Sequence, residues 1–281
     1  MAKKIVILTL CSVFILSIFI LIFKNQKIET SKKEKINVMV SILPQIDFVK
    51  NIGKDKIDVC AMIPPGFSPA TYEPSPNQLK KLSLANLYIR VGHIPFEKIQ
   101  MEKIKRLNLK MKVIDSSNGI EIYENDPHIW MSPKMVKIQV KNICNALIKA
   151  DFANRIFYKN NEKEYLARLD NLDIELKNAF SKMQGRKILV FHPAFGYLAR
   201  EYGFEQIAVE IGGKEPGAKN LAHIINEAKK ENIKIIFVQK QFSAKSAESI
   251  AKQINGKVVP LNPLAENYIE NLRNIAEEIQ K

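Results

Sequence analysis

Histidine, tryptophan and cysteine are scarce in this sequence, which has four, one and three of them among 281 residues. So few cysteines exclude a disulfide framework, because a fold held together by disulfides needs several pairs. Cys60 and Cys144 could form one bond outside the cell, but two separate buried cysteines are the simpler expectation. A site built from imidazoles has at most four residues to draw on.

A basic stripe interleaved with aromatic residues is also missing. The formal net charge of +14 would suit nucleic-acid binding. The lysines are scattered along the chain, however, and many alternate with glutamate on the expected helix faces. We therefore expect no nucleic-acid partner, and we attribute the charge to a background rich in lysine, isoleucine and asparagine.

A small-residue cleavage site is missing after the first apolar segment. Ile5 to Phe23 form an uninterrupted apolar run, and a membrane-spanning helix needs about 18 or more such residues. We predict that residues 1–35 form a retained membrane anchor and linker, with a cleaved signal peptide as the alternative. The bulky Leu10 disfavours lipid attachment at Cys11. Counted by themselves, the lysines that follow the run would favour a cytoplasmic location for that flank. An N-terminal segment of this kind nevertheless suits export. We therefore expect a membrane-associated protein of the periplasm or cell surface.

Short runs rich in valine and isoleucine, each followed by a turn signal and a helical pattern, recur from residue 36 onward. They predict eight strands at 36–42, 57–63, 87–92, 112–115, 188–192, 206–211, 233–239 and 257–262. Strands that alternate with helices form parallel sheets. Between the two sets of four strands, apolar residues at spacings of three and four predict one long amphipathic helix. They are Tyr165, Leu169, Leu172, Leu176, Phe180 and Met183.

The predicted fold class is therefore α/β, with two lobes that each contain a parallel four-stranded sheet and are joined by one long helix. We expect the N-terminal lobe at 36–150, the connecting helix at 151–185 and the C-terminal lobe at 186–281. Ligands of parallel α/β sheets lie beyond the carboxyl ends of the strands. The functional side chains are therefore expected at those ends, facing a cleft between the lobes.

Two of the four histidines follow predicted strands. His128 lies in DPHIWMSP after the fourth strand and a turn, and His192 lies in FHPAFGY at the end of the fifth strand. Alone, a histidine near Trp130 would be interpreted as a packing residue. Two histidines from different lobes at one cleft instead indicate a metal site, because neutral imidazole is the commonest protein ligand for zinc.

From Ile36 to the C-terminus the chain resembles the metal-binding subunits of zinc and manganese ABC importers, the periplasmic zinc-binding protein family. The matching motifs, in consistent order, are PPGFSPATYEP, DPHIWMSP, FHPAFGY, EPGAKNLA, VQKQFS and VVPLNPLAENYIENL. The resemblance implies a monomeric, non-enzymatic, extracytoplasmic solute-binding protein. It would capture a divalent metal, zinc in the first place and manganese as the alternative, and deliver it to an ABC permease. The resemblance also implies that His128 and His192 are metal ligands, one from each lobe.

The chain departs from this family at two expected ligand positions. Ala70 stands where the family has a histidine, and Asn262 stands where it has an aspartate. The family's histidine-rich loop is also missing, since 118–125 contains no histidine. A zinc site generally needs four donors, or three and a water. A site with two imidazoles and the weak amide oxygen of Asn262 should bind zinc much more weakly than the family's full set of ligands.

Other residues could replace the missing ligands. The candidates for substitute ligands are His93, after the third strand, and Glu210, at the end of the sixth. Two other functions remain open at this point. The first is a degenerate binding protein with weak or no metal binding that acts as a surface adhesin or interaction module. The second, a metal-dependent hydrolase, needs an acid or base beside an open metal position, and no motif supplies one convincingly.

Overall fold

The computed structural model describes residues 35–210, 214, 216–242 and 244–281. The apolar run predicted as a membrane anchor, with Cys11 inside it, lies outside these residues. Within the described ranges, no helix combines the length and the apolar character that a membrane crossing requires.

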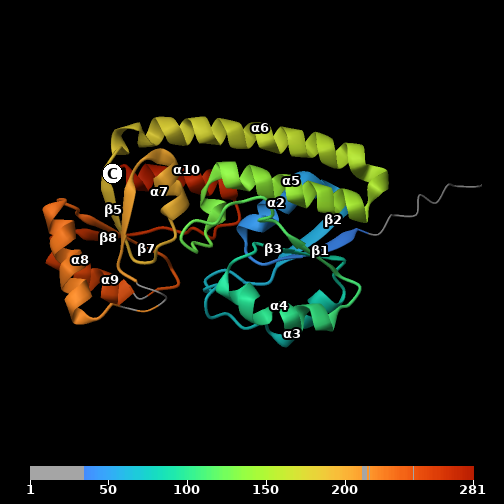
Figure 1. Ribbon diagram of the computed structural model, residues 1–281, viewed down its shortest axis with the longest axis horizontal. Coiled ribbons are helices and arrows are strands. Elements are labelled where there is room, and N and C mark those ends of the chain that lie inside the picture. The colour runs from blue at the N-terminus through green and yellow to red at the C-terminus, as the bar shows by residue number, and fades with distance from the viewer. Residues whose placement is uncertain (1–34, 211–213, 215, 243) are drawn as a thin grey trace, which may run out of the picture. The chain divides into compact units, whose positions relative to one another are not determined.

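The first sheet has four parallel strands in the order β2-β1-β3-β4. The strands are β1 (Ile36–Val40), β2 (Ile57–Ala61), β3 (Leu87–Arg90) and β4 (Lys112–Asp115). The helices of this lobe are α2 (Pro44–Gly53), α3 (Pro76–Ser83), α4 (Pro95–Leu107) and α5 (Pro133–Ala150). Each of them begins at a proline, whose fixed φ suits the first helical position and whose missing N–H is not needed there. Helices α2 and α5 lie on one side of the sheet, and α3 and α4 lie on the other (Figure 1).

The second sheet repeats this plan, with four parallel strands in the order β6-β5-β7-β8. The strands are β5 (Lys187–Val190), β6 (Glu205–Ala208), β7 (Ile235–Val238) and β8 (Lys257–Pro260). The helices are α7 (Gly196–Tyr202), α8 (Ala218–Lys230), α9 (Ala244–Gln253) and α10 (Tyr268–Ile279). The predicted α/β fold class with two parallel four-stranded sheets is confirmed.

The predicted long helix is α6 (Arg155–Phe180), which has 26 residues and runs along the molecule (Figure 1). It contacts α2 and α5 of the first lobe and α10 of the second. Its buried face contains Tyr158, Tyr165, Leu169, Leu172, Leu176 and Phe180. Burying each such side chain contributes about 1.5–3 kcal/mol to the stability of the fold. This face therefore holds both lobes against the same helix. Met183 of the predicted pattern lies beyond α6, in a short 3-10 turn.

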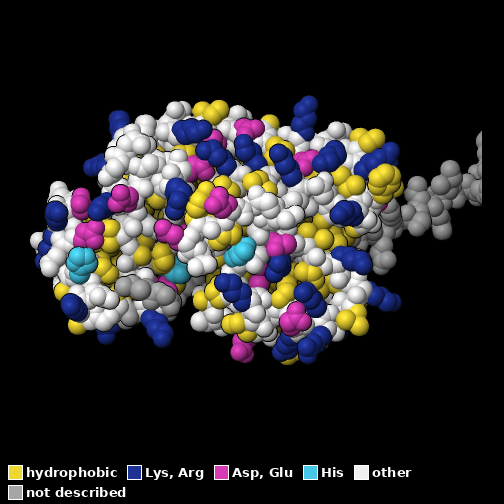
Figure 2. Space-filling model, in the orientation of Figure 1, with side chains coloured by type: hydrophobic (Ala, Val, Ile, Leu, Met, Phe, Trp, Pro, Cys, Tyr) yellow, Lys and Arg dark blue, Asp and Glu magenta, His cyan; other side chains and the backbone are white. Residues whose placement is uncertain are grey.

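The two cysteines of the described residues are both free, as expected. Cys144 is buried on α5, whereas Cys60 is half-buried on β2, beside the sulfur of Met39. The surface also fits the sequence analysis, because Lys and Arg side chains are spread over the visible face and interspersed with acidic ones (Figure 2).

One buried carboxylate holds the turn between β3 and α4. Glu97 accepts hydrogen bonds from the backbone N–H groups of Val91, at 2.6 Å, and Gly92, at 2.7 Å. It also accepts one from the hydroxyl of Ser41, on the neighbouring strand's end. Burial raises the pKa of Glu97 to about 7. The turn that it holds is the one that contains His93.

Candidate metal centre

His128 is presented by a turn that its own neighbours hold in place. The backbone N–H of His128 donates to Asp126 Oδ1 at 2.9 Å, and the same oxygen lies 2.6 Å from His128 Nδ1. The next three residues form a buried 3-10 turn (Ile129–Met131). Ser132 then caps α5 by accepting from the backbone N–H of Met135. The imidazole is therefore fixed by the carboxylate of Asp126 and by the buried 3-10 turn that follows it.

His192 lies two residues beyond the end of β5 and is held by its neighbouring strand. Gln239, buried just after β7, accepts from the backbone N–H of His192 at 3.3 Å and donates to its carbonyl oxygen at 3.1 Å. The imidazole stacks on Phe242, with ring centroids 4.9 Å apart. Its Nδ1 lies 2.7 Å from Glu210 Oε2. A carboxylate therefore orients this ring as well.

The structure brings the two histidines together, with His128 Nε2 and His192 Nε2 3.2 Å apart. Because each Nδ1 faces a carboxylate, we assign the proton of each neutral ring to Nδ1, which leaves a lone pair on each Nε2. Burial lowers the pKa of His128, which favours its neutral form. With this assignment, two lone pairs face each other and repel unless a proton or a metal cation lies between them. Two imidazoles on one tetrahedral zinc, with Zn–N of about 2.0–2.1 Å, place their nitrogens about 3.3 Å apart.

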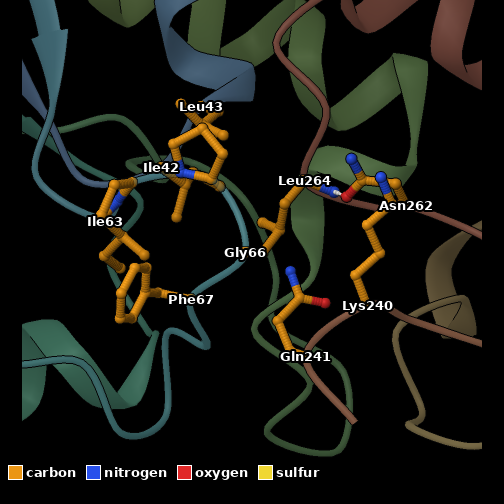
Figure 3. Close-up of a pocket in the computed structure, with 11 residues that line it drawn as sticks. Ile42, Leu43, Ile63, Gly66, Phe67, Lys240, Gln241, Asn262 and Leu264 are labelled. Carbon is orange, nitrogen blue, oxygen red and sulfur yellow. Dashed lines mark hydrogen bonds between the residues drawn. The ribbon is translucent and has the colours of Figure 1, made fainter. Parts of the chain in front are cut away.

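Asn262 borders a different cavity from the one that the two imidazoles share. Its Oδ1 accepts from the backbone N–H of Leu264 at 3.0 Å. The residue borders a separate cavity of about 90 Å³, together with Lys240, Gln241 and Phe67 (Figure 3). The amide oxygen therefore takes part in a local turn, which uses one of its two lone pairs.

The two candidate substitute ligands occupy different places. Glu210 lies behind the His192 ring, on its Nδ1 side, which is the position of a group that orients a ligand. His93 is half-buried in the turn after β3, and its neighbours Ile94 and Pro95 border the cavity beside the imidazoles. Among the described residues, no three His, Cys, Asp or Glu side chains are grouped so that they could hold a metal ion.

The imidazoles border a cavity of about 570 Å³ that residues of both lobes line. Ser68, Pro69 and Ala70 come from the loop after β2, and Tyr197 and Arg200 come from α7. Ala70 is thus at the site, as the resemblance implies, but it presents a methyl group and no donor atom.

Sequence reasoning missed two supporting residues. Asp126 orients His128, and an aspartate two positions before a histidine in a proline turn was the available signal. Gly196, the first residue of α7, lies against this carboxylate. A Cβ added at Gly196 would lie 2.6 Å from Asp126 Oδ2 and 3.1 Å from Gln206 Nε2. No periodicity predicts such a contact.

A family model described as the periplasmic zinc-uptake complex component A, ZnuA, matches residues 38–281. The chain belongs to this family. Membership makes it an extracytoplasmic substrate-binding component of a metal importer and not an enzyme, as predicted.

Relatives of known name span most of the chain. The high-affinity zinc uptake system protein ZnuA of Bacillus subtilis is 31% identical over 255 residues, which is 83% of this chain and 80% of that protein. The manganese ABC transporter substrate-binding lipoprotein PsaA of Streptococcus anginosus is 27% identical, over 88% of this chain and 86% of its own length. A crystal structure of ZnuA superposes with a TM-score of 0.85 and 40% identity, covering 88% of this chain and 98% of that one.

Proposed function

We propose that the protein captures a divalent cation between His128 Nε2 and His192 Nε2 and delivers it to an ABC permease. Zinc is the preferred ion and manganese the alternative. The observation that carries this proposal is the 3.2 Å separation of the two nitrogens. It matches the span of two imidazoles on one tetrahedral zinc, and carboxylates on both Nδ1 atoms leave both lone pairs facing the ion.

Contacts at Trp130 and Lys50 tie the lobes together, and the one at Trp130 lies beside the site. The indole N–H of Trp130 donates to the carbonyl of Pro263 at 2.8 Å, and Lys50 pairs with Glu266 at 2.7 Å. Helix α6 packs against helices of both lobes. A cation held by one histidine from each lobe would therefore tighten an existing contact, with little need for a large domain rotation. The permease would then distinguish the loaded form by the loops around the cavity.

Two imidazoles leave two positions of a tetrahedral shell to be filled from elsewhere. The amide oxygen of Asn262 accepts from Leu264, and the residue borders a different cavity from the imidazoles, so we propose that the other positions go to groups that the chain does not supply. Attachment to the membrane through residues 5–23 and a monomeric state remain predictions.

Zinc binding by the full chain in detergent, measured by competition with a fluorescent zinc chelator, tests the proposal. His128→Ala and His192→Ala should each weaken zinc binding by at least about 100-fold, since a site short of donors has none to spare. His223→Ala is the matched control, because His223 is exposed on α8. If both site variants bind zinc as tightly as the parent, the two-histidine site is wrong. A protein that binds no zinc at all would favour the adhesin or interaction module.

A further inference from the structure

We infer that the protein takes its metal as a complex with a small carboxylate chelator of amino-acid size, and that Arg200 binds the carboxylate. This inference rests on the proposed function, because it assigns the groups that complete the shell of the cation between His128 and His192. The chelator would supply the donors that Ala70 and Asn262 do not.

The size of the cavity is the first observation. It measures about 570 Å³ and opens directly onto the two imidazoles. A water molecule takes up about 30 Å³ in the liquid, so a bare ion with two waters would leave most of this space unused. Small-molecule sites in proteins typically measure about 300–1,000 Å³. The space that the two imidazoles border is therefore suited to an organic ligand.

The position of Arg200 is the second observation. It lies on α7 one turn beyond Gly196 and borders the same cavity as the imidazoles. Its guanidinium lies over the ring of Tyr123, 4.2 Å from the centroid. Arg200 is exposed, and no ion pair joins it to an acidic side chain within the part of the chain that the structure describes. A guanidinium placed over an aromatic ring, with no acidic partner among the described residues, is suited to bidentate binding of a carboxylate.

The charges around the cavity are the third observation. A divalent cation between His128 and His192 would be balanced by the carboxylates of Asp126 and Glu210, which contact the two Nδ1 atoms. Glu124 and Arg200 also line this cavity and carry opposite charges, and among the described residues the guanidinium contacts Tyr123 without forming an ion pair. A chelator with one carboxylate would bind this guanidinium, and its remaining donor atoms would face the cation. Tyr123 and Tyr197, whose ring centroids are 5.8 Å apart, form an aromatic wall for its carbon atoms.

The sign of a chelator's effect separates this inference from capture of the bare ion. At a site that takes the ion alone, free chelator withdraws zinc, and the fraction of protein with bound zinc falls. At a site that takes the complex, free chelator raises that fraction. The full chain in detergent is mixed with limiting zinc, with and without excess L-histidine or citrate, and loading is measured by native mass spectrometry.

We expect at least one of the two chelators to raise the apparent zinc affinity about tenfold or more, with a bound mass of zinc plus chelator. Arg200→Gln should lose most of this gain. Arg106→Gln, the same change at an exposed arginine on α4, should keep it. If both chelators lower loading and only bare zinc is found on the protein, the inference is overturned and the proposed function stands. If neither zinc nor its complexes bind, or if His128→Ala binds like the parent, the proposed function itself fails.

Discussion

Ala70 borders the cavity of the two imidazoles at the position where the importer subunits that this chain resembles have a histidine. Ala70→His should therefore add a third nitrogen donor without rearranging the fold. Even a group that only orients a ligand is commonly worth tenfold to 100-fold in metal affinity. A direct ligand should reach the upper end of this range, and 100-fold corresponds to about 2.7 kcal/mol.

This added binding energy stabilises the folded chain, because zinc binds the native state in preference to the unfolded one. A domain of this size gains about 2–4 °C in Tm for each kcal/mol. At saturating zinc, Ala70→His should melt roughly 5–10 °C higher than the parent, and without zinc the two should melt within about 2 °C of each other. Calorimetry on the full chain in detergent measures both values, with EDTA for the zinc-free state.

Asn262→Asp is the informative comparison. The family has an aspartate there, yet the Asn262 side chain accepts from Leu264 and borders the separate small cavity beside Lys240. The new carboxylate can keep that hydrogen bond and pair with Lys240, so a gain below about threefold is expected, or under 1 kcal/mol. A parent that already binds at nanomolar affinity, with no gain in Ala70→His, would refute the reasoning. Residues of this chain would then fill the vacant positions.

Three further predictions follow. Gly196→Ala should weaken zinc binding about tenfold in the same competition assay, because its methyl group would displace Asp126 from His128. The raised pKa of Glu97, about 7, lies above its unfolded value of about 4.3. The native state therefore holds a proton that the unfolded chain has lost, so stability should fall by up to about 3 kcal/mol as pH rises from about 4.5 to 7. Chemical denaturation at several pH values should show this slope, and Glu97→Gln should remove most of it. Intact-mass measurement on protein from its native membrane should find residues 1–35 retained, whereas a chain that starts near residue 25 would show cleavage.

The periodic part of the fold could be predicted from the sequence because it depends on burial. Runs of valine and isoleucine located all eight strands to within about three residues, as in β1, which ends at Val40 where the run continues to Ile42. The spacing from Tyr165 to Phe180 located the buried face of α6 for the same reason. Ligands of parallel sheets lie beyond the carboxyl ends of the strands, and this rule depends only on strand direction. It therefore also placed His128 and His192 at one cleft.

The orientation of individual polar side chains could not be predicted in this way. Glu210 was considered as a ligand, but its carboxylate lies on Nδ1 of His192. Asn262 was expected to offer its oxygen to the site, and the sequence did not show that this atom also accepts a hydrogen bond from the backbone of Leu264. Such contacts depend on one side-chain rotamer and one backbone angle, and neither produces a periodic pattern in the sequence.

The hydrogen bond between Trp130 and Pro263 joins positions 133 residues apart. A chain that crosses a membrane from its N-terminus presents His128 and His192 long before Pro263 arrives. The turn that contains His128 would meanwhile lack the surface on which Trp130 rests. The two imidazoles would therefore reach their final spacing only after Pro263 has joined the fold. Metal capture would then be a late step of maturation, confined to molecules that have emerged almost whole.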